Sequence, residues 1–390
     1  MTLHDTTIAP DPGAQSRSLP TPLRILALLA LLWVFLFAIA LMGTAFKVFG
    51  KDFSEALITT TTNPVIGLMI GLLATSIIQS SSGTTSIVVG LVAADALTVS
   101  GAIPIIMGAN MGTTVTNTIV AMGSMNRRTE FRRAFAGATM HDFFNLLTII
   151  VLFPLEMSTH YLERTATWLS SHLVGAQSLE YHSPVKAIVK PATKALDHLL
   201  TDGLGLSGSI NGIVMLIFSL VCLFGALTLL TKLMRSVVVR RAEGAFNKNI
   251  ANNGILGMIL GLMVTVLVQS SSITTSLLVP LIGAGIIPLE GAFAVTLGAN
   301  LGTTVTALLA SLAGNNAAVT VALVHLLFNI SGILIFYPFK PLRMIPLRLA
   351  RMLAMRTSRN RWFALYYMMG LFFVLPLIFV LISRALGSAS

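Results

Sequence analysis

The sequence predicts an all-α polytopic membrane protein with two inverted-topology repeats, each with a re-entrant helical hairpin and an interrupted transmembrane helix. Its composition, a long internal repeat and the placement of basic residues lead to this class. The 390 residues are 55% hydrophobic and 10% charged, and their mean hydropathy is +0.86. Soluble domains carry roughly 25% charged residues. This chain therefore lacks the polar residues needed to cover a water-exposed surface.

The apolar residues occur in runs long enough to cross a bilayer. Ile25 to Phe46, Ile210 to Thr231 and Phe363 to Ser383 each carry little or no charge and meet the requirement of about 20 residues. The polar stretch before Leu23 argues against a cleaved signal peptide. Cys222 is the single cysteine, which excludes an internal disulfide and a cysteine-based metal site.

The net charge of +11 does not indicate a nucleic-acid partner. The arginines lie in short loops beside apolar runs, which is the positive-inside pattern of membrane proteins.

A gapless internal repeat pairs Asn63–Thr116 with Asn253–Thr306 at an offset of 190 residues, and 25 of the 54 positions are identical. A weaker block pairs His141, Phe144 and Asn145 with His325, Phe328 and Asn329. We divide the chain into a cytoplasmic tail (1–22), membrane repeat 1 (23–156), an extracytoplasmic loop (157–209), membrane repeat 2 (210–341), and a basic cytoplasmic segment with a final transmembrane helix (342–390).

Corresponding loops of the two copies differ in basic content. The segment Asn126–Arg133 that follows the first repeated block is strongly basic, whereas Ala313–Asn316 after the second has no charge. The segments before each copy, and those after the weaker blocks at His141–Asn145 and His325–Asn329, also differ in basic content. The differences alternate as expected for loops on opposite sides of a membrane. The copies are therefore predicted to be inverted, as in secondary transporters whose site lies where the repeats meet.

Each copy carries a polar motif where the chain should be in the bilayer. Loop charges require an odd number of crossings between Asp52, outside, and Arg127, inside. We predict a re-entrant hairpin that turns at Gln79–Gly83, followed by one crossing over Ala102–Met122. Glycines and clustered threonines weaken that crossing. Non-helical backbone at this depth requires a protein or watery surround.

Small polar residues often only pack membrane helices together, but packing does not need a repeated glutamine. Carbonyl and hydroxyl oxygens suit hard cations, and broken helix ends add N–H groups that favour anions. Neither motif has a lysine or arginine, so a buried oxyanion needs mobile cations to neutralise it. This favours cation–anion cotransport, with a cation channel as the alternative.

Asp142 has no acidic counterpart in the second copy, where Leu326 stands. An ionisable residue within a span is a functional candidate, although pairing with an arginine such as Arg133 is an alternative. His141 and His325 are expected to hydrogen-bond between helices, with proton relay as the alternative. No Gly-x-Ser-x-Gly or His-Glu-x-x-His motif is present, so we expect no enzyme.

The duplicated Gln-Ser-Ser-Ser and Gly-Ala-Asn-x-Gly-Thr-Thr motifs, with the segments Glu130–Thr139 and His141–Asn145, resemble the type II sodium-dependent phosphate cotransporters. The resemblance covers both repeats and implies import of inorganic phosphate with sodium and no organic cofactor. It implies phosphate contacts from the motif serines: Ser80, Ser81, Ser82, Ser270, Ser271 and Ser272. It implies sodium ligands in both copies: Gln79, Asn110, Thr113, Thr116, Asp142, Gln269, Ser270, Asn300, Thr303 and Thr306.

In the resembling family an acidic residue after the motif histidine marks electrogenic members, so Asp142 implies an extra sodium site and net charge movement. Ala299 stands where many relatives have serine. Animal members of the resembling family have a disulfide-stapled outer loop, whereas Glu156–Gly208 lacks cysteine. The resemblance therefore implies a multi-pass protein of a bacterial inner membrane. Sulfate or arsenate is the alternative substrate. The sequence does not fix the oligomeric state, and a homodimer is among the arrangements it allows.

Overall fold

The computed structural model describes residues 20–174, 184–245 and 253–387, and these residues form helices and turns without a strand. Within these residues, six helical segments are long and apolar enough to cross a membrane. They are α1 (Thr21–Val48), α7 (Arg128–Thr159), α10 (Gly208–Ala245), α14 (Leu289–Ser311), α15 (Asn316–Phe336), and the last segment, α17 (Trp362–Met369), η2 (Gly370–Val374) and α18 (Leu375–Gly387). The prediction of an all-α multi-pass protein is confirmed.

The first predicted hairpin consists of two short helices, α3 (Pro64–Ile78) and α4 (Ser81–Ala93). They contain 15 and 13 residues, so each is about 20 Å long and shorter than the roughly 30 Å hydrocarbon core. The preceding helix α2 (Gly50–Thr61) meets α3 at 102°. The break between α3 and α4, at Gln79 and Ser80, lies at the predicted position of the turn.

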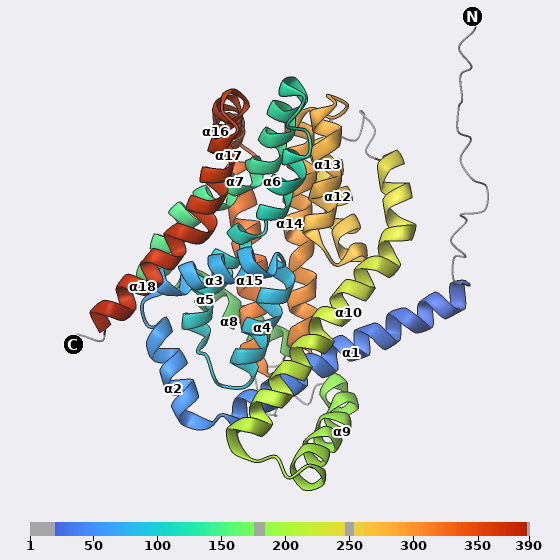
Figure 1. The fold of residues 1–390 in the computed structure, drawn as a ribbon, viewed down its shortest axis with the longest axis vertical. Helices are drawn as coiled ribbons and strands as arrows, with labels where there is room; N and C mark the ends of the chain where they lie inside the picture. Colours follow the sequence, from blue (N-terminus) through green and yellow to red (C-terminus); the bar gives the residue numbers. More distant parts are fainter. Residues whose placement is uncertain (1–19, 175–183, 246–252, 388–390) are drawn as a thin grey trace, which may run out of the picture.

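The second copy repeats this arrangement with α12 (Gly254–Val268) and α13 (Ser271–Gly283). Figure 1 shows α3 near the middle of the molecule and α4 below it, with α12 and α13 in the upper half. The inversion of the two copies remains a prediction from the loop charges.

The prediction of an interrupted helix in each copy is correct only for the first. There α5 (Val99–Gly112) stops and α6 (Val115–Met122) begins after Thr113 and Thr114. In the second copy α14 is continuous over 23 residues. Its repeated glycines do not break the helix, because they serve as packing surfaces against a neighbouring helix.

The glycines let two pairs of helices approach to backbone contact. A Cβ on Gly108 would overlap the carbonyl oxygen of Leu68 in α3, and a Cβ on Gly298 would overlap that of Met258 in α12. Gly71 and Gly261 meet the facing helix in the same way. Each hairpin is thus fixed to the helix that carries the repeated Asn and Thr residues.

The segment 157–209, predicted as a loop, is largely helical. It holds α8 (Tyr161–Val174), α9 (Pro184–His198) and the π-helical turn η1 (Leu199–Gly203). Helix α8 packs on α15, and α9 packs on α1. Part of each helix is buried by this packing, at Leu162 and Ala166 in α8 and at Val189 in α9, while Trp168, Leu173 and Ile188 stay exposed. Most of the predicted N-terminal tail, residues 1–19, lies outside the described residues.

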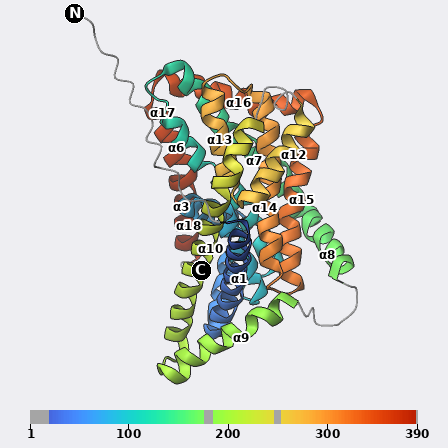
Figure 2. The ribbon, with the colours of Figure 1, turned by 90° about the vertical axis from the view of Figure 1, so that its right-hand side faces the viewer.

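The basic segments gather at one end of the molecule. Helix α16 (Lys340–Arg359) packs on α7, and Figures 1 and 2 both show it at the end opposite α9. Arg132 and Arg133 of α7 line the same cavity as Arg351 of α16. The two loops predicted to be cytoplasmic thus lie together, on the side opposite the segment predicted to be extracytoplasmic.

Candidate functional site

The two motif glutamines have the same unusual backbone conformation. Gln79 has φ 56° and ψ 29°, and Gln269 has φ 56° and ψ 28°. This left-handed region costs a residue with a Cβ about 1–2 kcal/mol, and glycine is the usual choice where a helix ends in it. A glutamine at both turns therefore indicates that the carboxamide has a use at this position.

The motif serines surround the first turn of the following helix. The Ser80 hydroxyl accepts a hydrogen bond from Gly83 N at 3.1 Å, and the Ser270 hydroxyl accepts one from Ile273 N at 3.4 Å. Both serines are N-caps of the usual kind. No hydrogen bond among the described residues uses the remaining four motif hydroxyls, which belong to Ser81, Ser82, Ser271 and Ser272. Each turn thus presents free hydroxyls beside a helix N-terminus, where anions are favoured.

Each glutamine reaches the predicted threonine of its own copy. Thr116 Oγ1 donates to Gln79 Oε1 at 3.4 Å, and Thr306 Oγ1 donates to Gln269 Oε1 at 2.8 Å. Gln269 is further held by a bond from its Nε2 to the Val266 carbonyl at 2.7 Å. Gln79 is exposed, whereas Gln269 is half-buried and borders a 270 Å³ cavity between α1, α10 and α12. The structure therefore brings one pair of predicted oxygen ligands together in each copy.

Asn110 and Asn300 lie elsewhere, in a buried network that joins the two copies. Asn300 Nδ2 donates to Asn145 Oδ1 at 3.2 Å and to Asn329 Oδ1 at 3.1 Å. His325 Nε2 contacts Asn110 Oδ1 at 3.1 Å. The histidine makes the interhelical hydrogen bond that was expected of it. The Nδ1 atoms of His141 and His325 are buried without a partner, so the network is not fully satisfied. Its asparagines nevertheless connect the two repeats inside the bundle.

The predicted threonines Thr113 and Thr303 bond back to carbonyls of their own helices. Thr113 Oγ1 donates to Ala109 O at 3.4 Å, and Thr303 Oγ1 donates to Ala299 O at 3.2 Å. Their hydroxyl oxygens keep lone pairs for a further ligand. Thr303 lies three residues before Thr306, so the two share one face of α14.

Asn117 is a site residue that sequence reasoning missed. From α6 it crosses to the second hairpin, where its Oδ1 accepts from Ser276 Oγ at 2.9 Å and its Nδ2 donates to Thr275 Oγ1 at 2.9 Å. At the position equivalent to Asn117, the second copy has Ala307. The hydroxyls of Thr85 and Ser86, which correspond to Thr275 and Ser276, are buried without a hydrogen-bond partner. The two halves of the site are therefore not equivalent.

Asp142 is buried and accepts a hydrogen bond at Oδ2 from Tyr367 Oη at 2.7 Å. Its Oδ1 makes no hydrogen bond, although Thr114 lies beside the carboxylate. The alternative of pairing with Arg133 is wrong, because that guanidinium lies against Gly285 at the basic end. A carboxylate in this setting carries a charge that nothing in the described chain neutralises. Tyr367 belongs to the last membrane span, outside both repeats, and could not be found from the repeat.

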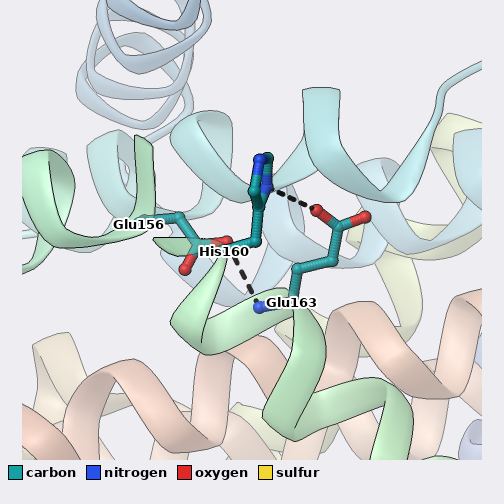
Figure 3. Close-up of side chains that lie close together, drawn as sticks. All are labelled: Glu156, His160 and Glu163. Carbon is teal, nitrogen blue, oxygen red and sulfur yellow. Dashed lines mark hydrogen bonds and ion pairs between the residues drawn. The ribbon is translucent and has the colours of Figure 1, made fainter. Parts of the chain in front are cut away.

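Glu156, His160 and Glu163 form a second polar cluster, at the junction of α7 and α8. Figure 3 shows the three side chains on this turn. The Glu156 carboxylate accepts from Leu162 N at 2.5 Å and from Glu163 N at 3.2 Å, and His160 has φ 54°. Glu156 thus caps the N-terminus of α8, which explains its burial without a ligand.

Comparison with known sequences identifies the family of this chain. The Na+/Pi-cotransporter family matches residues 34–175 and 221–373, which hold both motifs and both hairpins. This chain belongs to that family. Na+/Pi-cotransporters are a family of transporters.

Two animal transport proteins illustrate the similarity. Sodium-dependent phosphate transport protein 2A of Rattus norvegicus is 37% identical over 93% of this chain and 68% of its own length. Sodium-dependent phosphate transport protein 2B of Homo sapiens is 36% identical over 91% of this chain and 64% of its own length. The chain therefore spans about two thirds of the length of these relatives. No solved structure matches it significantly.

Proposed function

We propose that the protein imports inorganic phosphate with sodium ions by alternating access across a bacterial inner membrane. Sodium and phosphate enter this proposal from the family and from the printed names of its relatives. The observation that carries it is the pair of equivalent turns, Gln79 with Thr116 and Gln269 with Thr306. Both turns combine neutral oxygen ligands with free hydroxyls at a helix N-terminus.

Phosphate is assigned to the motif serines. Hydroxyls and N–H groups of Ser81 and Ser82 in α4, and of Ser271 and Ser272 in α13, donate hydrogen bonds to its oxygens. Ser80 and Ser270 hold the turns in shape through their caps. Neither motif supplies a cationic side chain, and moving an uncompensated anion into the bundle costs many kcal/mol. Sodium therefore makes phosphate binding possible as well as driving it.

Sodium is assigned to the neutral oxygens beside each turn. In the second copy Gln269, Ser270, Thr303 and Thr306 supply carboxamide, hydroxyl and carbonyl oxygens, the ligand type that hard cations prefer. In the first copy Gln79, Thr113 and Thr116 occupy the equivalent positions. Asn110 and Asn300 were predicted as direct ligands, and their place in the central network supports a connecting role, in which they relay changes between the two sodium sites.

Asp142 is proposed as an additional sodium ligand that makes transport electrogenic. Its Oδ1 is free, its Oδ2 is oriented by Tyr367, and no cationic side chain pairs with it in the described chain. A buried carboxylate without a partner is stabilised strongly by a cation. Each transport cycle would then carry a net charge of +1 inward, because the sodium ions bring one more positive charge than phosphate brings negative charges.

Uptake of labelled phosphate into proteoliposomes tests this function. With an inward sodium gradient we expect accumulation that disappears when potassium replaces sodium on both sides. Excess unlabelled sulfate should not compete, while competition by sulfate as strong as that by phosphate would favour the other oxyanion. A channel would instead give sodium currents without phosphate. Uptake that is indifferent to sodium would reject the proposal.

A further inference from the structure

A basic cavity of about 590 Å³ lies at the end of the molecule that carries the arginines, apart from both motif turns. Its walls come from α7, from the turn between α13 and α14, and from α16. None of the motif residues lines it. The volume is within the range of roughly 300–1,000 Å³ that small-molecule sites occupy. The cavity is large enough for a separate ligand.

Three guanidinium groups surround this cavity, from Arg132, Arg133 and Arg351. Glu290 is bonded to Arg351, with Arg351 Nη2 at 2.5 Å from its Oε1. In the described part of the chain Arg132 and Arg133 form no ion pair. The other acidic residue nearby, Glu130, pairs with Arg127. The cavity therefore has an excess of positive charge.

The N-terminus of α14 adds to this charge. Pro288 and Leu289, where the helix begins, are both in the cavity wall, and Pro288 offers no side-chain cap. The first N–H groups of a helix have no acceptor within it and carry partial positive charge. Arg133 Nη1 would lie only 2.7 Å from a Cβ on Gly285, whose φ is +76°. The guanidinium thus covers the turn that leads into α14.

We infer that this cavity binds a phosphate group, through Arg132, Arg133 and the N-terminus of α14. Guanidinium groups match phosphate oxygens in a bidentate geometry, and helix N-termini add N–H donors. The rest of the wall is apolar, with Ile282, Ile287 and Met355 among its residues. Such a wall accommodates the glycerol and acyl parts of a phospholipid. Basic pockets between membrane helices on the cytoplasmic side bind anionic headgroups. Released inorganic phosphate carries the same group and is the other source.

Binding measured on the purified protein in neutral detergent tests the inference without transport. The probes are dihexanoyl phosphatidylglycerol, dihexanoyl phosphatidylcholine and labelled inorganic phosphate. The pocket variant carries Arg132→Gln and Arg133→Gln. The matched control carries Arg356→Gln and Arg359→Gln, which remove the same charge from exposed positions of α16 outside the cavity.

We expect the wild type and the control to bind phosphatidylglycerol at least about tenfold more tightly than phosphatidylcholine, and the pocket variant to lose this preference. If free phosphate is the source instead, its binding should weaken in the pocket variant and persist in Gln269→Ala, in which the proposed transport site is damaged. Equal losses in the pocket and control variants would show a general charge effect and overturn the site. Unchanged binding of all probes by the pocket variant would overturn it as well.

Discussion

The two motif glutamines offer a way to separate ligand binding from packing, because the same substitution removes different contacts in each copy. Gln269→Ala removes a 2.8 Å bond from Thr306 and a 2.7 Å bond to the Val266 carbonyl. Gln79→Ala removes a single 3.4 Å bond from Thr116 at an exposed position. The left-handed backbone is the same at both turns and accepts Gln and Ala equally badly, so it cancels in the comparison.

The magnitudes follow from these contacts. Two neutral bonds of about 1 kcal/mol each predict a loss of ~2 kcal/mol in the free energy of unfolding of Gln269→Ala, with Thr306 left buried. One long, exposed bond predicts a loss below about 0.5 kcal/mol for Gln79→Ala. If both carboxamides bind sodium, both variants nevertheless lose coupled uptake, because neither can neutralise the anion.

Unfolding in detergent micelles gives the stabilities, and sodium-driven phosphate uptake per folded molecule gives the function. Ile77→Ala and Leu267→Ala are the matched controls, each two residues before its glutamine and exposed. Uptake should fall in both glutamine variants and persist in both controls. Normal uptake by Gln79→Ala, together with a loss in Gln269→Ala that only follows its stability, would refute the ligand role and favour packing.

Three further predictions concern Asn117, Tyr367 and Gly298. Asn117→Ala should lower the unfolding free energy by about 1–2 kcal/mol, since Ser276 loses its acceptor; an unchanged denaturation midpoint would contradict this. Tyr367→Phe should weaken the apparent sodium affinity several-fold while phosphate uptake at saturating sodium persists, because it frees Asp142 Oδ2 without removing the carboxylate; unchanged sodium dependence of uptake currents would exclude the positioning role. Gly298→Ala should cost about 1–3 kcal/mol or more through overlap with a backbone carbonyl, and a normal yield of folded protein would argue against the close helix crossing.

The sequence predicted those features that long apolar runs and the repeat encode directly. The hairpin turns at Gln79 and Gln269 were predicted correctly. A polar motif within an apolar run has to lie inside the protein or along a water-filled cavity, and a turn of the chain meets this requirement. The pairing of each glutamine with a threonine of its copy follows the 37-residue spacing that both copies keep.

The rest depended on contacts that the repeat does not encode. Asn117 was missed because its counterpart is Ala307, and the site residues were sought among residues that recur in both copies. Tyr367 reaches Asp142 across 225 residues of chain, a distance at which no local pattern applies. The continuity of α14 was mispredicted because glycines that break a helix and glycines that pack one look alike in sequence. The helices of 157–209 were read as a loop because their charged residues masked amphipathic faces.

In the proposed mechanism, phosphate is held in the bundle only together with sodium. Equilibrium binding of labelled phosphate to the purified protein, in sodium chloride and in potassium chloride of equal ionic strength, tests it most directly. Linkage requires that sodium raise phosphate affinity as much as phosphate raises sodium affinity. We expect saturable phosphate binding in sodium chloride that is lost in potassium chloride and in Gln79→Ala. Equal phosphate affinity in the two salts would contradict it.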